Sequence, residues 1–204
     1  MSFCLFAVFG EPLSVDEERL ARIPGLEKAH VYTPDRAHDP FLNDGAPPPL
    51  ALQLYFRTLG ALEAVDYPAL GLAATATCQA MRVRTFVSQP VRQPYCTYLV
   101  SYEGPAEDPA AWHARYLAHH PPLMAKLPGL RELEVYEPVA WRAAVPWTRV
   151  DYLQRNKVAF DDAAALSAAL DSPERRAMRA DYAKLPKFSG AVKHYPMATR
   201  RLLS

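Results

Sequence analysis

The sequence predicts an α+β protein built from two tandem β-α-β-β-α-β repeats. A repeated segment, a repeated order of elements and an ordinary globular composition support this prediction. Residues 24–34 (PGLEKAHVYTP) recur as residues 128–138 (PGLRELEVYEP), with identical or similar side chains at seven of the eleven positions. The two segments lie about half of the 204-residue chain apart. A repeat of this length is too long for a solenoid unit, so we expect two copies of one small domain.

The C-terminal copy shows the order of elements more clearly. Strands are predicted where β-branched and aromatic residues cluster or alternate, and helices where an N-cap residue precedes a proline. The predicted elements are a strand at 97–102, a helix at 109–120, strands at 130–136 and 149–160, a helix at 163–184 and a strand at 191–195. The second helix is expected to restart at Pro173, where Asp171 and Ser172 offer a new N-cap.

The N-terminal copy has the same order with a shorter first helix. Its predicted elements are strands at 5–9, 26–32, 50–56 and 81–87, a helix that opens with a capping box at 14–17 and a helix at 59–65. This order is that of the ferredoxin-like unit, in which two helices cover one face of a four-stranded antiparallel sheet. Because the other face would be bare, we expect the two copies, residues 1–90 and 95–204, to pack sheet against sheet and close a barrel.

Composition and charge exclude several classes of function. Half of the residues are apolar and the net charge is +1, so the chain has no electrostatic footprint for nucleic acid or for anionic membranes. No apolar run approaches the ~20 residues of a membrane helix, and the N-terminal segment lacks the basic region of a secretory signal. The three cysteines form no CxxC pair, and Cys4 and Cys96 are expected to be buried in strands. We therefore expect a cytoplasmic protein.

Two segments of the C-terminal half carry the motifs of a known family. Residues 115–130 (RYLAHHPPLMAKLPGL) contain a helix-borne histidine, a following proline and a Leu-Pro-Gly-Leu turn. Residues 158–190 (VAFDDAAALSAALDSPERRAMRADYAKLPKFSG) contain a phenylalanine, an alanine-rich helix, a Ser-Pro-Glu restart and a terminal Asp. These motifs, best matched across residues 96–197, resemble the EthD-like family of the dimeric α+β barrel superfamily. The resemblance implies such a barrel within one chain. Relatives include isomerases, decarboxylases, dehydratases, cofactor-independent oxygenases and haem-binding enzymes, so the reaction stays open.

Two adjacent histidines are the strongest candidates for catalysis. The helical period places six side chains on one face of the helix that starts at Pro109: Trp112, Tyr116, His119, His120, Leu123 and Leu127. Histidine titrates near neutrality and can take or give a proton. Pro121 and Pro122 lack N–H groups, so we expect a kink that opens a pocket wall beside His120. The resemblance places His120 at the family's histidine position. In the alternative interpretation, one histidine is exposed and the other is a satisfied core or capping residue.

The other candidate residues belong to substrate binding. Four aromatic side chains could line a pocket for a planar apolar substrate or simply belong to the core: Trp112, Tyr116, Tyr98 and Tyr136. Asp181 matches the family's helix-terminal acid, and is otherwise a solvated charge or a cap. His194, on the last predicted strand, could face either repeat or the solvent. The loop at 35–49, which contains His38 and Asp39, could cover a pocket or be only a connection.

The sequence offers no metal or cofactor motif. Adjacent histidines point about 100° apart on a helix and cannot easily chelate one ion. A Gly-rich phosphate loop, a nucleophile elbow and a dinucleotide fingerprint are all missing from the sequence, so we expect no cofactor.

These observations predict a cofactor-free enzyme for a small hydrophobic, aromatic or lactone-like metabolite. In this hypothesis His120, assisted by His119 or Tyr116, moves a proton in an isomerisation, dehydration, decarboxylation or carbon–carbon lyase step. One alternative is a non-catalytic protein that binds a hydrophobic ligand. The other is a haem-dependent or cofactor-independent oxygenase. The sequence leaves open whether two chains pair as a homodimer.

Overall fold

The computed structural model describes residues 2–72 and 74–203, which form nine strands, five α-helices and one 3-10 helix. The strands are β1 (Ser2–Phe9), β2 (Leu26–Pro34), β3 (Leu50–Phe56), β4 (Ala76–Ser88), β5 (Tyr95–Tyr102), β6 (Glu132–Pro138), β7 (Thr148–Arg149), β8 (Gln154–Phe160) and β9 (Val192–Leu203). The helices are α1 (Glu17–Ala21), α2 (Leu59–Glu63), the 3-10 helix η1 (Pro68–Leu70), α3 (Pro109–Met124), α4 (Ala163–Leu170) and α5 (Pro173–Tyr182).

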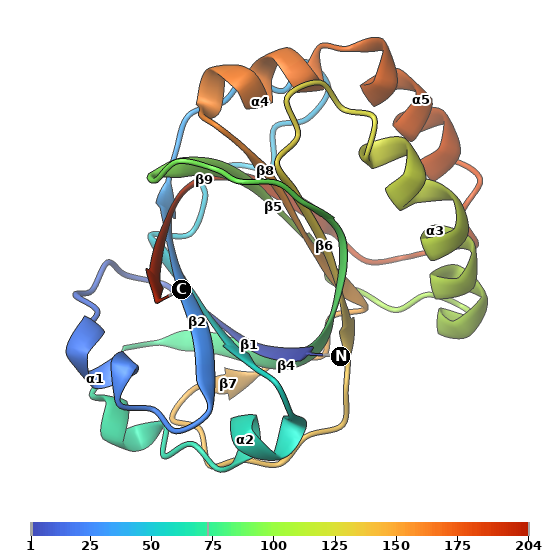
Figure 1. Ribbon diagram of the computed structural model, residues 1–204. Coiled ribbons are helices and arrows are strands. Elements are labelled where there is room, and N and C mark those ends of the chain that lie inside the picture. The colour runs from blue at the N-terminus through green and yellow to red at the C-terminus, as the bar shows by residue number, and fades with distance from the viewer. Residues whose placement is uncertain (1, 73, 204) are drawn as a thin grey trace.

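Eight of these strands close into an antiparallel barrel, which Figure 1 shows end-on. Each half of the chain contributes four adjacent strands, in the orders β4-β1-β3-β2 and β9-β5-β8-β6. The two groups join where β2 pairs with β9 and where β4 pairs with β6. The short β7 adds only a two-residue parallel pairing to β4. Closure pairs the strands that would otherwise be sheet edges. The inner faces of the two four-stranded groups therefore face each other inside the barrel.

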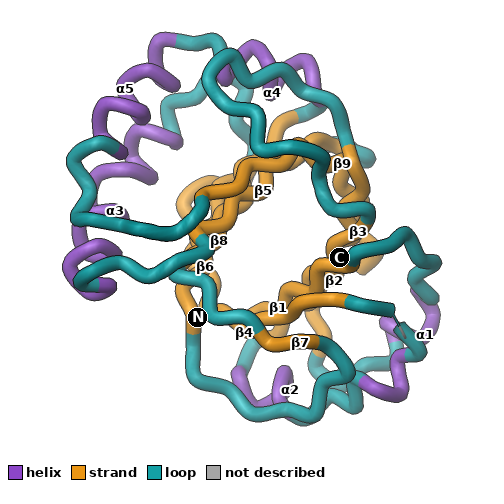
Figure 2. Tube along the Cα trace, turned by 180° about the vertical axis from the view of Figure 1, so that it is seen from behind, coloured by secondary structure: helices purple, strands orange, loops and turns teal. Residues whose placement is uncertain are grey.

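The helices cover the outside of the barrel in two groups (Figures 1 and 2). Helices α3, α4 and α5 lie outside the strands of the C-terminal half, whereas α1 and α2 lie on the opposite side of the ring. Each group buries an apolar core against its strands, with Leu54 and Leu62 in one core and Trp112 and Leu166 in the other. Among the described residues, no helix is both long and apolar enough to cross a membrane.

The interior of the barrel holds polar and aromatic side chains. Lys157, which is fully buried, forms ion pairs with Glu132 (2.6 Å) and Glu134 (3.4 Å). The hydroxyls of Tyr55 and Tyr136 each donate a hydrogen bond to the Glu134 carboxylate at 2.6 Å. Burial raises the pKa of Glu134, but the ammonium groups and the tyrosine hydroxyls outweigh burial and hold this pKa well below its usual range. These buried charges are therefore paired rather than isolated.

Two connections cross from one half of the chain to the other. Residues 35–49, between β2 and β3, reach the C-terminal half, where the backbone N–H of His38 donates to the Ser167 hydroxyl (2.9 Å). Residues 139–147, after β6, pack against the N-terminal core, where Trp147 is buried and donates through Nε1 to a backbone carbonyl (3.2 Å). The two connections occupy equivalent places in the two halves. Each half therefore covers part of the other.

Most of the predicted elements are present, and the bounds differ where distant contacts act. Strand β3 coincides with the prediction, and α4 and α5 are separated at Pro173 as expected. Strand β9 has twelve residues instead of the five predicted, because its second half pairs with β2 from the other half of the chain. Helix α3 continues beyond His120 through Pro121 and Pro122 to Met124.

The first helix is shorter than the capping-box motif predicted. The N-cap of α1 is Asp16, whose side chain accepts from the backbone N–H of Arg19 (3.0 Å). The capping-box motif predicted the cap at Ser14. An Asp carboxylate is as good an N-cap as a Ser hydroxyl, so the start moved by two residues.

Candidate functional site

A cavity of about 370 Å³ lies beside α5, where α3 and the strands of the C-terminal half meet it. It adjoins a smaller hollow of about 30 Å³ that extends between the sheet and the helices. Five residues line both spaces: Tyr102, His120, Arg175, Met178 and His194. The remaining wall of the larger cavity comes from Leu42, Arg179, Tyr182, Ala183 and Val192. A largely apolar wall with a few convergent polar groups is typical of a small-molecule site.

His120 is the residue of this cavity best placed to move a proton. It is 5% exposed, and its Nδ1 lies 3.0 Å from Oδ2 of Asp181 on α5. Because a carboxylate only accepts hydrogen bonds, we assign the ring hydrogen to Nδ1. Nε2 then keeps its lone pair, and it has no hydrogen-bond partner in the part of the chain that the structure describes. Burial lowers the pKa of His120 although the bond to Asp181 raises it, so the ring is neutral at neutral pH.

Asp181 is held in place by the packing of α3 against α5. Its side chain is buried, and its Oδ1 accepts from Arg115 on α3 at 3.4 Å. The solvated charge that the sequence also allowed is thus not what the structure shows. A carboxylate in this position orients the His120 ring and stabilises the imidazolium that forms when Nε2 takes a proton.

Arg175 on α5 brings a positive charge to the same cavity. It is 7% exposed, and its Nη2 donates to Oδ2 of Asp39 at 3.2 Å. Its Nε is buried and lacks a hydrogen-bond partner within residues 2–72 and 74–203. Asp39 also accepts from the hydroxyl of Tyr98 (2.7 Å). Burial raises the pKa of Asp39, but these bonds and the guanidinium charge outweigh burial and lower it. An anionic oxygen in the cavity would meet a guanidinium that is only partly engaged by the protein.

A second histidine–aspartate pair faces the cavity from β9. Nδ1 of His194 lies 2.8 Å from Oδ2 of Asp44, which also accepts the backbone N–H of His194 at 2.9 Å. Burial lowers the pKa of His194. Asp44 and Asp39 both belong to the connection at 35–49, so the N-terminal half completes a cavity of the C-terminal half. This contact settles two alternatives: His194 faces the C-terminal cavity, and the 35–49 connection covers it.

Stacked aromatic rings support His120 from behind. The Tyr116 ring lies 4.8 Å from the His120 ring and stacks on Trp112, with centroids 4.9 Å apart and planes inclined by 12°. The Tyr116 hydroxyl accepts from Asn156 (2.7 Å) and lies 3.5 Å from the Tyr102 hydroxyl. Burial raises the pKa of Tyr116 to about 12. Tyr116 and Trp112 are fully buried and fix the ring rather than line the cavity.

Two of the predicted site residues lie away from the cavity. His119 is exposed on α3, because adjacent helical residues point about 100° apart and only one of the pair can face the sheet. Tyr136 lies in the barrel interior, bonded to Glu134. Tyr98 lines the smaller hollow. Its side chain lies on the opposite face of β5 from the side chain of Leu99.

Arg175, Tyr102 and Asp44 belong to the site but were not predicted from the sequence. The sequence does contain a signal for Arg175. Four lining residues of α5 follow the i, i+3, i+4, i+7 pattern of one helix face: Arg175, Met178, Arg179 and Tyr182. Tyr102 lies on the same face of β5 as Tyr98, four residues earlier. Asp44 gave no signal, since only the path of a connection between the halves brings it to His194.

Comparison with known families places this site in a recognised domain. The EthD domain matches residues 104–189, the segment that carries α3, α4 and α5 together with His120, Arg175 and Asp181. This C-terminal segment is therefore similar to the EthD domain. The matched domain leaves out Asp39, Asp44 and His194, so the EthD-like cavity is completed by residues outside it. No curated protein matches the chain.

Several solved structures resemble this protein over nearly its whole length. An anthrone oxidase-like protein is 14% identical with a TM-score of 0.58, and the match covers 98% of this chain and 93% of the anthrone oxidase-like chain. A proposed monooxygenase from Lactobacillus acidophilus has 11% identity and a TM-score of 0.58, covering 97% and 93%. A chlorite dismutase variant from Candidatus Nitrospira defluvii has 13% identity and a TM-score of 0.54, covering 97% and 91%. At these identities the likeness concerns the fold, and it agrees with a closed α+β barrel.

Proposed function

We propose that this EthD-like protein is a cofactor-free enzyme in which His120 acts as general base and acid on a small hydrophobic metabolite. The observation that carries the proposal is the geometry of one side chain. His120 is buried at a cavity, its Nδ1 is held by Asp181, and its Nε2 has no hydrogen-bond partner among the described residues. A neutral imidazole with one fixed and one free nitrogen can accept a proton and return it.

The polar groups of the cavity suggest how the step proceeds. Nε2 of His120 would take a proton from a carbon next to a substrate carbonyl, and the electron pair of the C–H bond would move to the carbonyl oxygen. Arg175 would stabilise the resulting oxyanion, because its guanidinium lines the cavity and is only partly engaged by Asp39. Return of the proton to another carbon gives an isomer, and its return to a departing β-hydroxyl group releases water in a dehydration. In a carbon–carbon lyase step His120 would instead take the proton of a β-hydroxyl group. A C=O bond would then form as the C–C bond breaks, and Arg175 would stabilise the departing enolate, which the imidazolium reprotonates.

The walls of the cavity favour a planar, aromatic or lactone-like substrate. Tyr102 and Tyr182 line the larger space together with Met178 and Val192. A volume of about 370 Å³ suits a small metabolite rather than a polymer. A protein that only stores a hydrophobic ligand would be expected to have a dry cavity with its histidines turned outward. The inward placement of His120 and His194 supports an enzyme over such a binding protein.

The same histidine suits a second candidate, a haem-dependent or cofactor-independent oxygenase. The structural neighbours include an anthrone oxidase-like protein and chlorite dismutase. A histidine whose Nδ1–H is held by a carboxylate is also the usual arrangement of a metal ligand. His120 would then hold the haem, and the haem would supply the redox chemistry. A Soret band that forms with added haemin and is lost in His120→Gln would support this candidate. A protein that forms no such band is not a haem enzyme of this kind.

The proton-transfer proposal is tested by following deuterium from solvent into a panel of aryl ketones and aromatic lactones by NMR. His120→Gln should slow exchange by about 10²–10⁴-fold, the range for a lost general base. His119→Gln is the matched control, because His119 is exposed on the same helix, and it should leave the rate unchanged. Equal rates in His120→Gln and the wild type would exclude His120 from the mechanism.

We also propose that residues 1–90 and 95–204 are two ferredoxin-like copies that arose by duplication. Support comes from the same order of elements in both halves and from the matching strand orders β4-β1-β3-β2 and β9-β5-β8-β6. A cytoplasmic location and the pairing of two chains as a homodimer remain proposals from the sequence. Size-exclusion chromatography with light scattering would decide the second.

A further inference from the structure

Arg155 on β8 is a buried cation inside the barrel that the proposed function does not use. It is only 9% exposed, and its Nε is buried without a hydrogen-bond partner. In the described part of the chain its guanidinium forms no ion pair and donates no hydrogen bond. A guanidinium has five N–H donors in a planar fork. Burial without a hydrogen bond is costly for Nε, and the Nη donors, which form no bond within residues 2–72 and 74–203, are open to a ligand.

Aromatic rings supply part of the compensation for this buried charge. The guanidinium carbon of Arg155 lies 4.7 Å from the centroid of the Tyr152 ring and 5.3 Å from that of Phe6. Both distances allow cation–π attraction, but ring faces leave the N–H donors at the edge of the guanidinium free. Glu103, an acidic residue that lines the same hollow, accepts from the hydroxyl of Ser101 at 2.7 Å. The contrast with Lys157, which pairs with two carboxylates in the same barrel, is clear.

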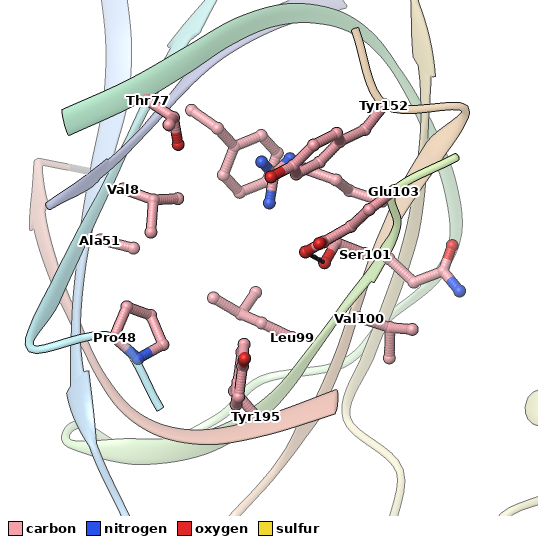
Figure 3. A pocket seen from close by; sticks show the side chains of 13 residues that line it. Val8, Pro48, Ala51, Thr77, Leu99, Val100, Ser101, Glu103, Tyr152 and Tyr195 are labelled. Carbon is pink, nitrogen blue, oxygen red and sulfur yellow. Dashed lines mark hydrogen bonds between the residues drawn. The ribbon is translucent and has the colours of Figure 1, made fainter. Parts of the chain in front are cut away.

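Arg155 lines a small hollow at one mouth of the barrel, which Figure 3 shows from close by. Its volume of about 60 Å³ is room for only a few water-sized groups, since one water needs about 10–15 Å³ on this measure. Val8, Ala51 and Pro48 form an apolar wall, and Ser101, Glu103 and Tyr152 gather on the other side (Figure 3). The hollow therefore combines a free cationic fork with a place for a small apolar group.

We propose that this barrel mouth binds a small monocarboxylate, with its carboxylate against Arg155 and its alkyl group against Val8 and Leu99. A carboxylate matches the guanidinium fork through two parallel hydrogen bonds. The Glu103 carboxylate at the rim adds a negative charge that disfavours a second anionic group on the ligand. The volume limits the ligand to the size of acetate or propionate. The site lies inside the barrel, whereas His120 lies outside it, so the two proposals are independent.

The experiment uses the full chain and sodium acetate at constant ionic strength, with sodium chloride as the balancing salt. Saturation-transfer NMR gives the dissociation constant, and intermolecular NOEs locate the methyl group of acetate. We expect NOEs from that methyl group to the side chains of Val8 and Leu99. Arg155→Met should weaken binding at least about tenfold, the loss expected when charged hydrogen bonds are removed. Glu103→Gln should strengthen binding, and the exposed Arg92→Gln should leave it unchanged.

Three results would overturn the proposal. Absence of saturation transfer to acetate would mean that Arg155 is compensated by its aromatic neighbours alone. Acetate could bind equally well to Arg155→Met, or its NOEs could fall on residues outside the hollow, and either result would place the anion elsewhere. If Arg155→Met does not fold, the NOEs in the wild type and in Glu103→Gln still decide the question.

Discussion

Replacing Asp181 by Asn tests the assigned chemistry of His120 directly. The Nδ1–Oδ2 distance is 3.0 Å, and both side chains are buried. A hydrogen bond to a charged group contributes about 1.5–3 kcal/mol, which corresponds to a factor of about 10 to 150 in an equilibrium. Asp181→Asn removes the negative charge that stabilises the imidazolium. We therefore expect turnover to fall by about this factor and the pKa of His120 to fall further below its ordinary value of 6.5.

The assay is a pH titration of the histidine ring nitrogens by NMR. In the wild type we expect the neutral ring with hydrogen on Nδ1 and a pKa below 6.5. In Asp181→Asn the amide can donate to Nδ1, so we expect the hydrogen to move in part to Nε2, where it blocks the base. His119→Gln should leave both properties unchanged. A wild-type pKa at or above 6.5, or a ring hydrogen on Nε2, would refute the reasoning about His120.

Three further predictions concern stability. Gly104→Ala should destabilise the fold by roughly 1–3 kcal/mol in urea unfolding, because the new Cβ would lie 2.1 Å from the facing glycine Cα. Its control, Gly60→Ala in helix α2, meets no atom within 4 Å and should stabilise by about 0.5–1 kcal/mol. Lys157→Met should cost about 3–5 kcal/mol, because it removes the buried ammonium shared by Glu132 and Glu134, whereas Lys187→Met, in an exposed pair, should cost under about 1 kcal/mol. Because the buried histidines have pKa values below 6.5 in the folded state, the unfolded chain takes up protons first as the pH falls. Stability should therefore drop as the pH falls below 6.5, and by less in His120→Gln. A stability that does not change below pH 6.5 would contradict the lowered pKa values.

Local patterns in the sequence predicted most of the elements, because the signals for strands and helices lie within a few residues of each other. Strand β3 was placed at its observed bounds, and the restart at Pro173 followed from a local N-cap and proline. Strand β9 was predicted too short, because residues 197–203 are ordered by pairing with β2, about 165 residues away in the chain. Pairing between distant strands depends on closure of the barrel and leaves no periodic trace in either strand alone.

The candidate site divides in the same way. The sequence alone predicted the helix that carries His119 and His120 and the acid at Asp181. Only the tertiary structure decided which imidazole faces inward, that Asp181 holds it, and that Arg175 shares the cavity. It also decided that Asp44, from the other half of the chain, reaches His194. The physical reason is that residue type and spacing are local properties, whereas burial and hydrogen-bond partners depend on segments that meet only when the barrel closes.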